Sequence, residues 1–281
     1  MTRMRSGEVI SLVIFGVAFA ALYGGDIYGM VRDWSIDDNY SHGYLIPVVS
    51  GYLLWQRREE VAAAALEARP TYWGIVPILV GLLVYLVGNF AGEPFTMRFS
   101  MLFVMAGVIL FAYGMSLFRT VSFPFFYLIF MIPLPFIIYD SLAFPLKLFV
   151  TKYSVETLKL LGIPVLREGN VITLVNTTLE VADACSGMRS LVSLLALATA
   201  LAYFAHKGWG KRAILIMLAI PIAILANAVR VIGTGILASR IGAKAAEGFF
   251  HEFAGLVIFG VSMVMLVFAS YCLNRIGKDH E

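Results

Sequence analysis

Long apolar stretches, separated by short polar segments, run through most of the chain. A helix needs about 20 apolar residues to cross the hydrocarbon core of a bilayer, with a range of about 17–25. Eight stretches reach or approach this length: Val9–Met30, Tyr40–Trp55, Tyr72–Phe90, Phe99–Phe118, Val121–Tyr139, Met188–Ala205, Ala213–Leu237 and Phe253–Leu273. The pattern therefore predicts an all-α integral membrane protein with about eight transmembrane helices.

Prolines modify two of these stretches. The second stretch is short and contains Pro47, while the fifth contains Pro124, Pro133 and Pro135. Since proline removes a backbone donor and clashes with the preceding turn, we expect the fifth helix to kink or break near its end.

The segment from Asp140 to Asp183 is the only long region between predicted spans. Its first part, residues 142–161, mixes apolar residues with three lysines, which predicts a helix lying in the membrane interface with its lysines, Lys147 among them, reaching the headgroups. Its second part, EGNVITLVNTTLEVADA, is rich in β-branched residues around Asn176-Thr177 and indicates a possible short β-hairpin. An irregular surface loop is the alternative.

Composition supports one membrane domain over residues 1–281. Apolar residues make up 60% and charged residues 14% of the chain, against about 25% charged in soluble domains. No run of basic residues is longer than two, so nucleic acid is not an expected partner, whereas membrane lipids are.

Lysine and arginine also favour one orientation. With the N-terminus in the cytoplasm, 11 of the 21 basic residues fall in cytoplasmic segments, including Arg57, Arg58 and Arg69. Cytoplasmic loops of membrane proteins carry such an excess. We therefore expect both termini in the cytoplasm.

Three residues on different predicted helices share the outer membrane level: Cys185, Arg230 and His251. A cysteine at a helix start becomes a better nucleophile when a cation lowers its pKa, and Arg189 lies one turn on. A histidine can carry the proton, and a guanidinium can stabilise an oxyanion. Each also has a plain alternative, because a lone cysteine usually packs and Arg230 or His251 could be interfacial anchors. Cys272, near the cytoplasmic end of the last stretch, is expected to be structural.

Four motifs occur in order along the chain: DNYSHGYLIP (residues 38–47), ADACSGMRSL (residues 182–191), NAVR (residues 227–230) and FFHEFAG (residues 249–255). Together they resemble the exosortase/archaeosortase family of membrane-embedded cysteine transpeptidases, over residues 38–255. The resemblance implies a nucleophile at Cys185, an essential arginine at Arg230 and a third catalytic position at His251. Histidine there resembles the bacterial exosortases.

The resemblance also implies location, substrate and partners. We expect a multi-pass protein of the bacterial cytoplasmic (inner) membrane with its active site on the periplasmic side. Its substrates would be exported proteins whose C-terminal tail combines a short motif, often Pro-Glu-Pro, with a transmembrane helix and a basic cluster. A thioester acyl-enzyme would pass the new C-terminus to an acceptor. This chemistry needs no metal or organic cofactor.

Several residues are candidates for supporting or substrate-binding roles. Tyr40, Ser41 and His42 begin the second predicted helix on the outer side, and His42 is a rival general base to His251. Asn227 opens the NAVR motif. The competing function is a non-enzymatic transporter or lipid-handling protein, although such proteins often show repeated halves and mid-membrane charges, neither of which the sequence indicates.

Overall fold

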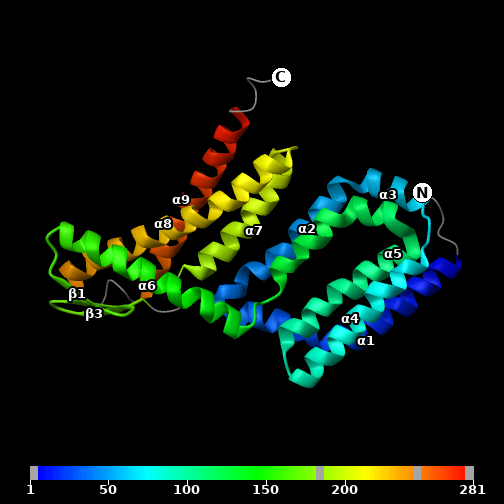
Figure 1. The fold of residues 1–281 in the computed structure, drawn as a ribbon, viewed down its shortest axis with the longest axis horizontal. Coiled ribbons are helices and arrows are strands. Elements are labelled where there is room, and N and C mark those ends of the chain that lie inside the picture. Colours follow the sequence, from blue (N-terminus) through cyan, green and yellow to red (C-terminus); the bar gives the residue numbers. More distant parts are fainter. Residues whose placement is uncertain (1–5, 182–186, 243–247, 276–281) are drawn as a thin grey trace. The chain divides into compact units, whose positions relative to one another are not determined.

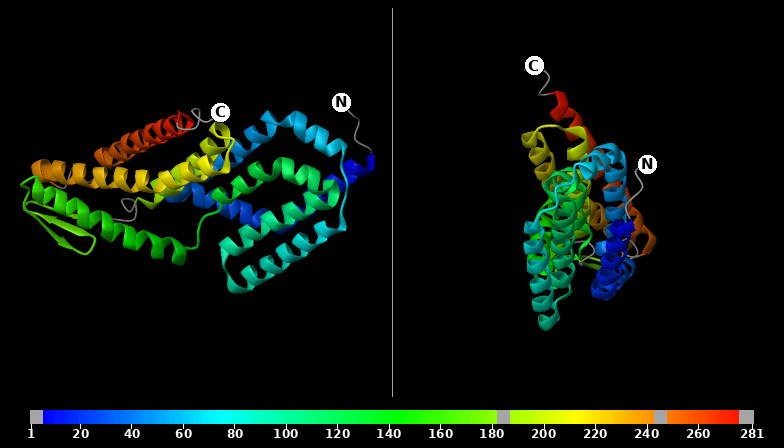
Figure 2. Two further views of the ribbon diagram at one scale, coloured as in Figure 1. Left: turned by 45° about the horizontal axis from the view of Figure 1, so that its top comes forward. Right: turned by 90° about the vertical axis from the view of Figure 1, so that its right-hand side faces the viewer.

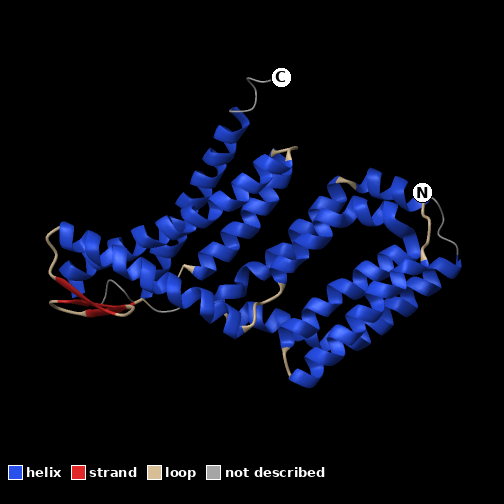
Figure 3. Ribbon diagram, in the orientation of Figure 1, coloured by secondary structure: helices blue, strands red, loops and turns tan. Residues whose placement is uncertain are grey.

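The computed structural model describes residues 6–181, 187–242 and 248–275, with side chains from residue 13 onwards and, in the last segment, from residue 253. By internal contacts the chain forms two compact units, Met1–Pro135 and Phe136–Glu281, and each is described by itself. Helices dominate both units (Figures 1 and 3). That the chain acts as one membrane domain stays a prediction.

The first unit contains helices only in its described part. They are α1 (Ser6–Ile36), η1 (Asp38–Tyr44), α2 (Leu45–Gln56), α3 (Arg58–Leu66), η2 (Tyr72–Gly74), α4 (Ile75–Ala91), α5 (Pro94–Tyr127) and η3 (Leu128–Met131).

Glycines at a spacing of seven bring α4 against the first half of α5. A Cβ at Gly74 would lie 2.3 Å from the Phe111 nitrogen, and one at Gly88 would lie 2.9 Å from the Met97 nitrogen. Gly81 lies between them on the same face, close to Val104. Small residues of this kind allow helix backbones to approach closely within a membrane, where no hydrophobic effect drives the helices together.

Gly114 reverses the direction of α5 and divides it into two arms. Its φ of 79° is in the left-handed range, and a Cβ would lie 2.1 Å from the carbonyl oxygen of Arg69. The Arg69 N–H donates to the Tyr113 carbonyl at 3.2 Å, which fixes the chain beside this turn. Figures 1 and 2 show the arm after the turn running back from it.

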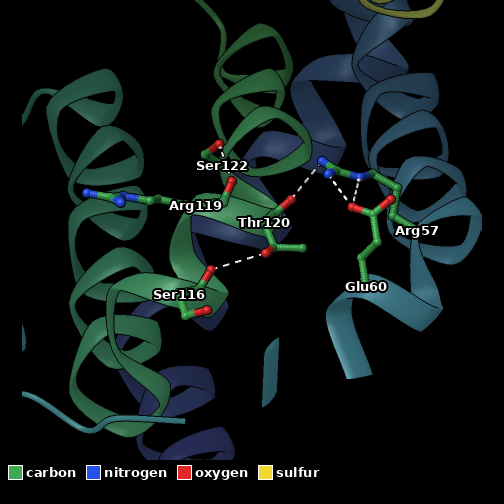
Figure 4. Close-up of polar contacts among 6 residues, drawn as sticks. All are labelled: Arg57, Glu60, Ser116, Arg119, Thr120 and Ser122. Carbon is green, nitrogen blue, oxygen red and sulfur yellow. Dashed lines mark hydrogen bonds and ion pairs between the residues drawn. The ribbon is translucent and has the colours of Figure 1, made fainter. Parts of the chain in front are cut away.

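The second arm of α5 depends on α2 and Arg57 for its backbone hydrogen bonds. Pro124 has no N–H, so the carbonyl of Thr120, one turn earlier, lacks its helical donor. Nη1 of Arg57 donates to that carbonyl at 3.0 Å, as Figure 4 shows, and Glu60 accepts from Nε of the same guanidinium at 3.0 Å. Ser50 on α2 donates to the Pro124 carbonyl at 2.8 Å. Side chains of neighbouring segments thus supply hydrogen bonds to the helix backbone around Pro124.

Six helices of the described chain are long and apolar enough to cross a membrane, fewer than the eight expected: Val13–Ile36, Tyr72–Ala91, Pro94–Met131, Met188–Ala205, Trp209–Ile241 and Phe253–Arg275. The predicted second span is reduced to the 12 residues of α2, about 18 Å long, because its first residues belong to the 3-10 helix η1 and α2 begins only at Leu45. The predicted fourth span and the first part of the predicted fifth form the single element α5 with η3, in which Gly114 leaves only a short second arm, while residues 136–139 begin α6. The expected break at Pro133 and Pro135 is confirmed, since no helix covers residues 132–135.

Apolar side chains cover the outside of these helices. Leu83 on α4 is 62% exposed, Phe90 is 87% exposed and Val264 on the last helix is 65% exposed. Large apolar groups on the outside of a bundle are what a lipid environment requires. The fold is therefore that of an all-α multi-pass membrane protein.

The second unit carries the remaining elements. They are α6 (Phe136–Leu160), β1 (Val165–Glu168), β2 (Val171–Leu174), β3 (Thr178–Glu180), α7 (Met188–Ala205), α8 (Trp209–Ile241) and α9 (Gly248–Arg275).

The N-terminal half of α8 packs with α7 and α9 around small residues. Leu194, Ala198 and Ala202 recur every four residues along one face of α7, and they meet Ala219 on α8 and Leu266 on α9. A spacing of four places side chains on one helix face, and alanine lets the partner helices approach.

The C-terminal half of α8 packs instead against α6 and a small sheet. Figures 1 and 2 show α6 lying along this part of α8. Val150 of α6, Ile172 and Leu179 of the sheet, and Val231 and Ala238 of α8 share one apolar cluster. With 33 residues α8 is about 50 Å long, which leaves room for both partners.

The β-branched segment forms three strands where a hairpin of two was expected. The order is β1-β2-β3 and both pairings are antiparallel, with Ile172 opposite both Arg167 and Leu179. The helix expected from residue 142 exists as α6, but Lys147 is only 7% exposed. That lysine faces the packed side of α6, so the prediction that it extends to the headgroups is wrong.

Candidate functional site

The start of α7 is held against α8 at Gly187. This residue is the N-cap of α7, with a φ of 84°, and a Cβ there would lie 2.9 Å from Nδ2 and 3.1 Å from Cβ of Asn227. Only glycine combines the left-handed backbone with this close approach. Asn227 itself is 4% exposed. The NAVR motif therefore begins in direct contact with the residue two positions after Cys185.

Arg230 lies one turn beyond Asn227 and contacts α9. A Cβ at Gly255 would lie 3.4 Å from both Cζ and Nη2 of Arg230, so the guanidinium lies against the bare backbone of Gly255. The Arg230 side chain is half-buried. Residues three apart on a helix share a face, which is why Asn227 and Arg230 are at neighbouring levels of α8.

The FFHEFAG motif occupies the first two turns of α9. His251 lies in the first turn of α9, four residues before Gly255, so its backbone position is one turn away on the same helix face. Its side chain is outside the described part of the structure. Three segments distant in sequence thus meet at one level of the second unit, with α8 between α7 and α9.

Two further candidate residues, Cys185 and Arg189, belong to the ADACSGMRSL motif at the start of α7. Cys185 lies outside the described residues. Arg189 is the second residue of α7 and its side chain is exposed, so it borders the same helix start.

The DNYSHGYLIP motif belongs to the first unit, where its residues make packing contacts. Tyr40 Oη donates to the carbonyl of Leu134 at 3.2 Å, and Ser41 Oγ donates within η1 to Asp38 at 3.0 Å. A Cβ at Gly43 would lie 2.3 Å from Nε1 of Trp34, whose N–H donates to the Met131 carbonyl. The motif therefore holds the end of α1 against the end of η3.

His42 is half-buried within η1. The second helix was expected to begin at Tyr40, but residues 38–44 form a 3-10 helix and α2 starts at Leu45. Roles for Tyr40, Ser41 and His42 at the site of Arg230 stay predictions, since those residues and Arg230 belong to different units.

An ion pair inside the first unit was missed by the sequence analysis. Nη1 of Arg98 lies 2.7 Å from Oδ2 of Asp33, which joins α5 to α1, and Arg98 is 7% exposed. Both residues fall between predicted spans, since Asp33 follows the stretch that ends at Met30 and Arg98 directly precedes the one that begins at Phe99. The pair could have been suspected from the sequence, because each residue is a charged side chain within one or two turns of the end of an apolar stretch.

Close clusters of metal-ligand side chains are absent from the described residues, where no three His, Cys, Asp or Glu could hold one ion. Cys272 is a free, half-buried thiol on α9.

The fold defines a polytopic α-helical membrane protein, in which α8 contacts the start of α7 at Gly187 and the second turn of α9 at Gly255. A family model described as transmembrane exosortase (Exosortase_EpsH) matches residues 34–268. The chain therefore belongs to the transmembrane exosortase family, as the motifs indicated. Neither the curated proteins nor the solved structures gave a significant match.

Proposed function

We propose that this chain is a membrane-embedded cysteine protease and transpeptidase that cleaves the C-terminal sorting tail of exported proteins. The observation that carries the proposal is the double contact on α8, where Asn227 meets Gly187 and Arg230 meets Gly255. This arrangement brings together the segments that contain the predicted nucleophile, guanidinium and imidazole. Membership of the transmembrane exosortase family supports the same reading.

In the proposed reaction the Cys185 thiolate attacks the scissile carbonyl carbon. The N–H groups of Arg230 stabilise the oxyanion of the tetrahedral intermediate, since a guanidinium presents donors in a fixed plane. His251 accepts the thiol proton and returns it to the leaving amine, so that a thioester remains. An acceptor amine or hydroxyl, or water, then attacks the thioester and restores the thiol. Asn227 and Arg189 have supporting roles.

The proposed substrates carry the motif, transmembrane helix and basic cluster expected from the family resemblance. The proposed location is the bacterial cytoplasmic membrane, with both termini in the cytoplasm and the site on the periplasmic side. Membrane lipids surround the enzyme.

Co-expression with one such substrate tests the mechanism. We expect Cys185→Ala to accumulate full-length substrate, as measured by mass spectrometry of the substrate's C-terminus. Cys272→Ala is the control and should process normally, because its thiol lies elsewhere on α9. Continued processing by Cys185→Ala, in cells without a related enzyme, would eliminate the thiol mechanism and favour a transport or lipid-handling role.

A second experiment tests the orientation. In a Cys272→Ala background, Cys185 should react with a membrane-impermeant maleimide added to the periplasmic side of intact spheroplasts. Labelling that occurs only after the membrane is opened would reverse the proposed topology.

A further inference from the structure

The strand β3 ends the sheet and has one unpaired edge. The strand order places β2 on one side of β3, and no element of the described chain pairs with the other side. An edge strand presents a row of unused N–H and C=O groups, which an extended peptide can join as a further strand.

The register shows which residues of β3 offer these groups. Leu174 donates to the Thr177 carbonyl at 2.8 Å, and Val181 donates to the Asn170 carbonyl at 2.9 Å. In an antiparallel pair, residues bonded to the partner alternate with residues whose N–H and C=O point away. Positions 177, 179 and 181 therefore face β2, whereas Thr178 and Glu180 direct their backbone groups to the open edge.

The side chains of β3 leave this edge accessible. Leu179 packs into the apolar cluster with α6 and α8, which anchors the strand. Thr178 and Glu180 are exposed on the opposite face. The strand is therefore fixed on its buried face, while the backbone groups of two residues stay available.

The sequence connects this edge directly to the proposed nucleophile. Cys185 is five positions after Glu180, a length of chain that reaches at most about 18 Å. The free edge of β1 lies two strands further away, at about 4.8 Å per strand. Of the two edges, that of β3 is the one continuous with the catalytic segment.

We propose that the open edge of β3 binds the polypeptide substrate as an added β-strand beside the scissile bond. This inference rests on the proposed function and adds its mode of substrate recognition. Backbone pairing at Thr178 and Glu180 would hold an extended stretch of the sorting tail largely independently of its side chains. The occupant is the stretch of substrate that flanks the cleaved bond, since a protease must present that bond in extended form.

Proline at position 180 removes an outward N–H without touching the ladder between β2 and β3. Proline is accepted on an edge strand when its nitrogen faces away from the partner strand, and the residue before it favours the extended backbone that Leu179 already has. One net hydrogen bond changes an equilibrium constant by about two- to tenfold, and the proline ring also obstructs the added strand.

The experiment compares purified variants acting on a substrate protein in detergent micelles. We expect kcat/KM of Glu180→Pro to be at least about fivefold below that of Glu180→Ala, chiefly through KM. Thr178→Pro should behave in the same way. The matched control is Arg167→Pro, which removes the outward N–H of the other edge strand, β1, and should retain wild-type kcat/KM. Thermal midpoints near that of the wild type verify that each variant is folded.

Three outcomes would overturn the inference: Glu180→Pro with wild-type kcat/KM, Glu180→Ala as impaired as Glu180→Pro, or Arg167→Pro as impaired as Glu180→Pro. Cys185→Ala is assayed in parallel. An active Cys185→Ala refutes the proposed function itself, whereas an inactive one with an unimpaired Glu180→Pro refutes only the binding mode.

Discussion

Gly187→Ala should destabilise the second unit by more than backbone strain alone. Alanine at a left-handed φ costs about 1–2 kcal/mol. The new Cβ would also lie 2.9–3.1 Å from three atoms of Asn227, closer than van der Waals contact. Overpacking of this kind typically costs a further 1–3 kcal/mol, so the total is about 2–5 kcal/mol.

Gly162→Ala separates these two contributions. Gly162 follows α6 in the same unit, its φ is 76°, and an added Cβ would meet no atom within 4 Å. Both substitutions also restrict the unfolded chain equally, so that effect cancels. Gly162→Ala therefore reports the strain alone, and the difference between the variants reports the contact with Asn227.

The assay is thermal unfolding of the purified proteins in detergent micelles. A difference of 1–3 kcal/mol corresponds to a midpoint about 2–12 °C lower for Gly187→Ala than for Gly162→Ala. In an Asn227→Ala background the penalty of Gly187→Ala should shrink, because Cγ and Nδ2 are gone while Cβ remains. Equal midpoints for the two glycine variants would show that Gly187 does not approach Asn227 as described.

Further expectations concern other contacts. Arg230→Lys should insert normally but process substrate at least about tenfold more slowly, because lysine lacks the fixed planar donors, whereas Arg240→Lys at the exposed end of α8 should match the wild type. Arg57→Met should lower stability by about 1–3 kcal/mol, since it leaves the part-buried Thr120 carbonyl without a donor. Arg58→Met should change stability little, because the Trp55 carbonyl to which Arg58 donates is exposed and can bind water instead. Burial lowers the pKa of His206; the nearby charges of Lys211 and Arg212 lower it further, while a hydrogen bond to Asn274 opposes them. Below about pH 6.5 the folded state therefore binds fewer protons than the unfolded state. The thermal midpoint should fall as the pH is lowered through this range. An unchanged pH profile in His206→Gln would exclude this histidine as the cause.

The sequence predicted the helices of the second unit better than those of the first. The predicted spans at residues 188–205 and 253–273 nearly coincide with α7 and α9, since uninterrupted apolar runs leave a membrane helix as the only way to satisfy the backbone. In the first unit Gly114 sits inside an apolar run, and only the tertiary contact with Arg69 shows that the chain reverses there. Hydropathy does not register a turn made at a single glycine, so the predicted count of eight spans is not confirmed.

The candidate site was predictable as a set of residues, but its assembly was not. Helix spacing placed Arg230 and His251 at one level, yet it could not show that α8 is the element the other two helices contact. The contacts that reveal this involve Gly187 and Gly255, which carry no chemistry of their own. Their signal in the sequence was position alone, since each lies within four residues of a predicted catalytic residue.

The two halves of α8 connect the candidate site with the strand proposed to bind substrate. Its N-terminal half packs on α7 and α9 through small residues, and its C-terminal half packs on α6 and the sheet. Asn227 and Arg230 lie where these two kinds of packing meet, and Val231 of the sheet cluster directly follows Arg230. The sheet therefore packs against the residue of α8 that directly follows the guanidinium-bearing position. On this argument, substrate that binds at β3 and the donors of Arg230 are held by one continuous element.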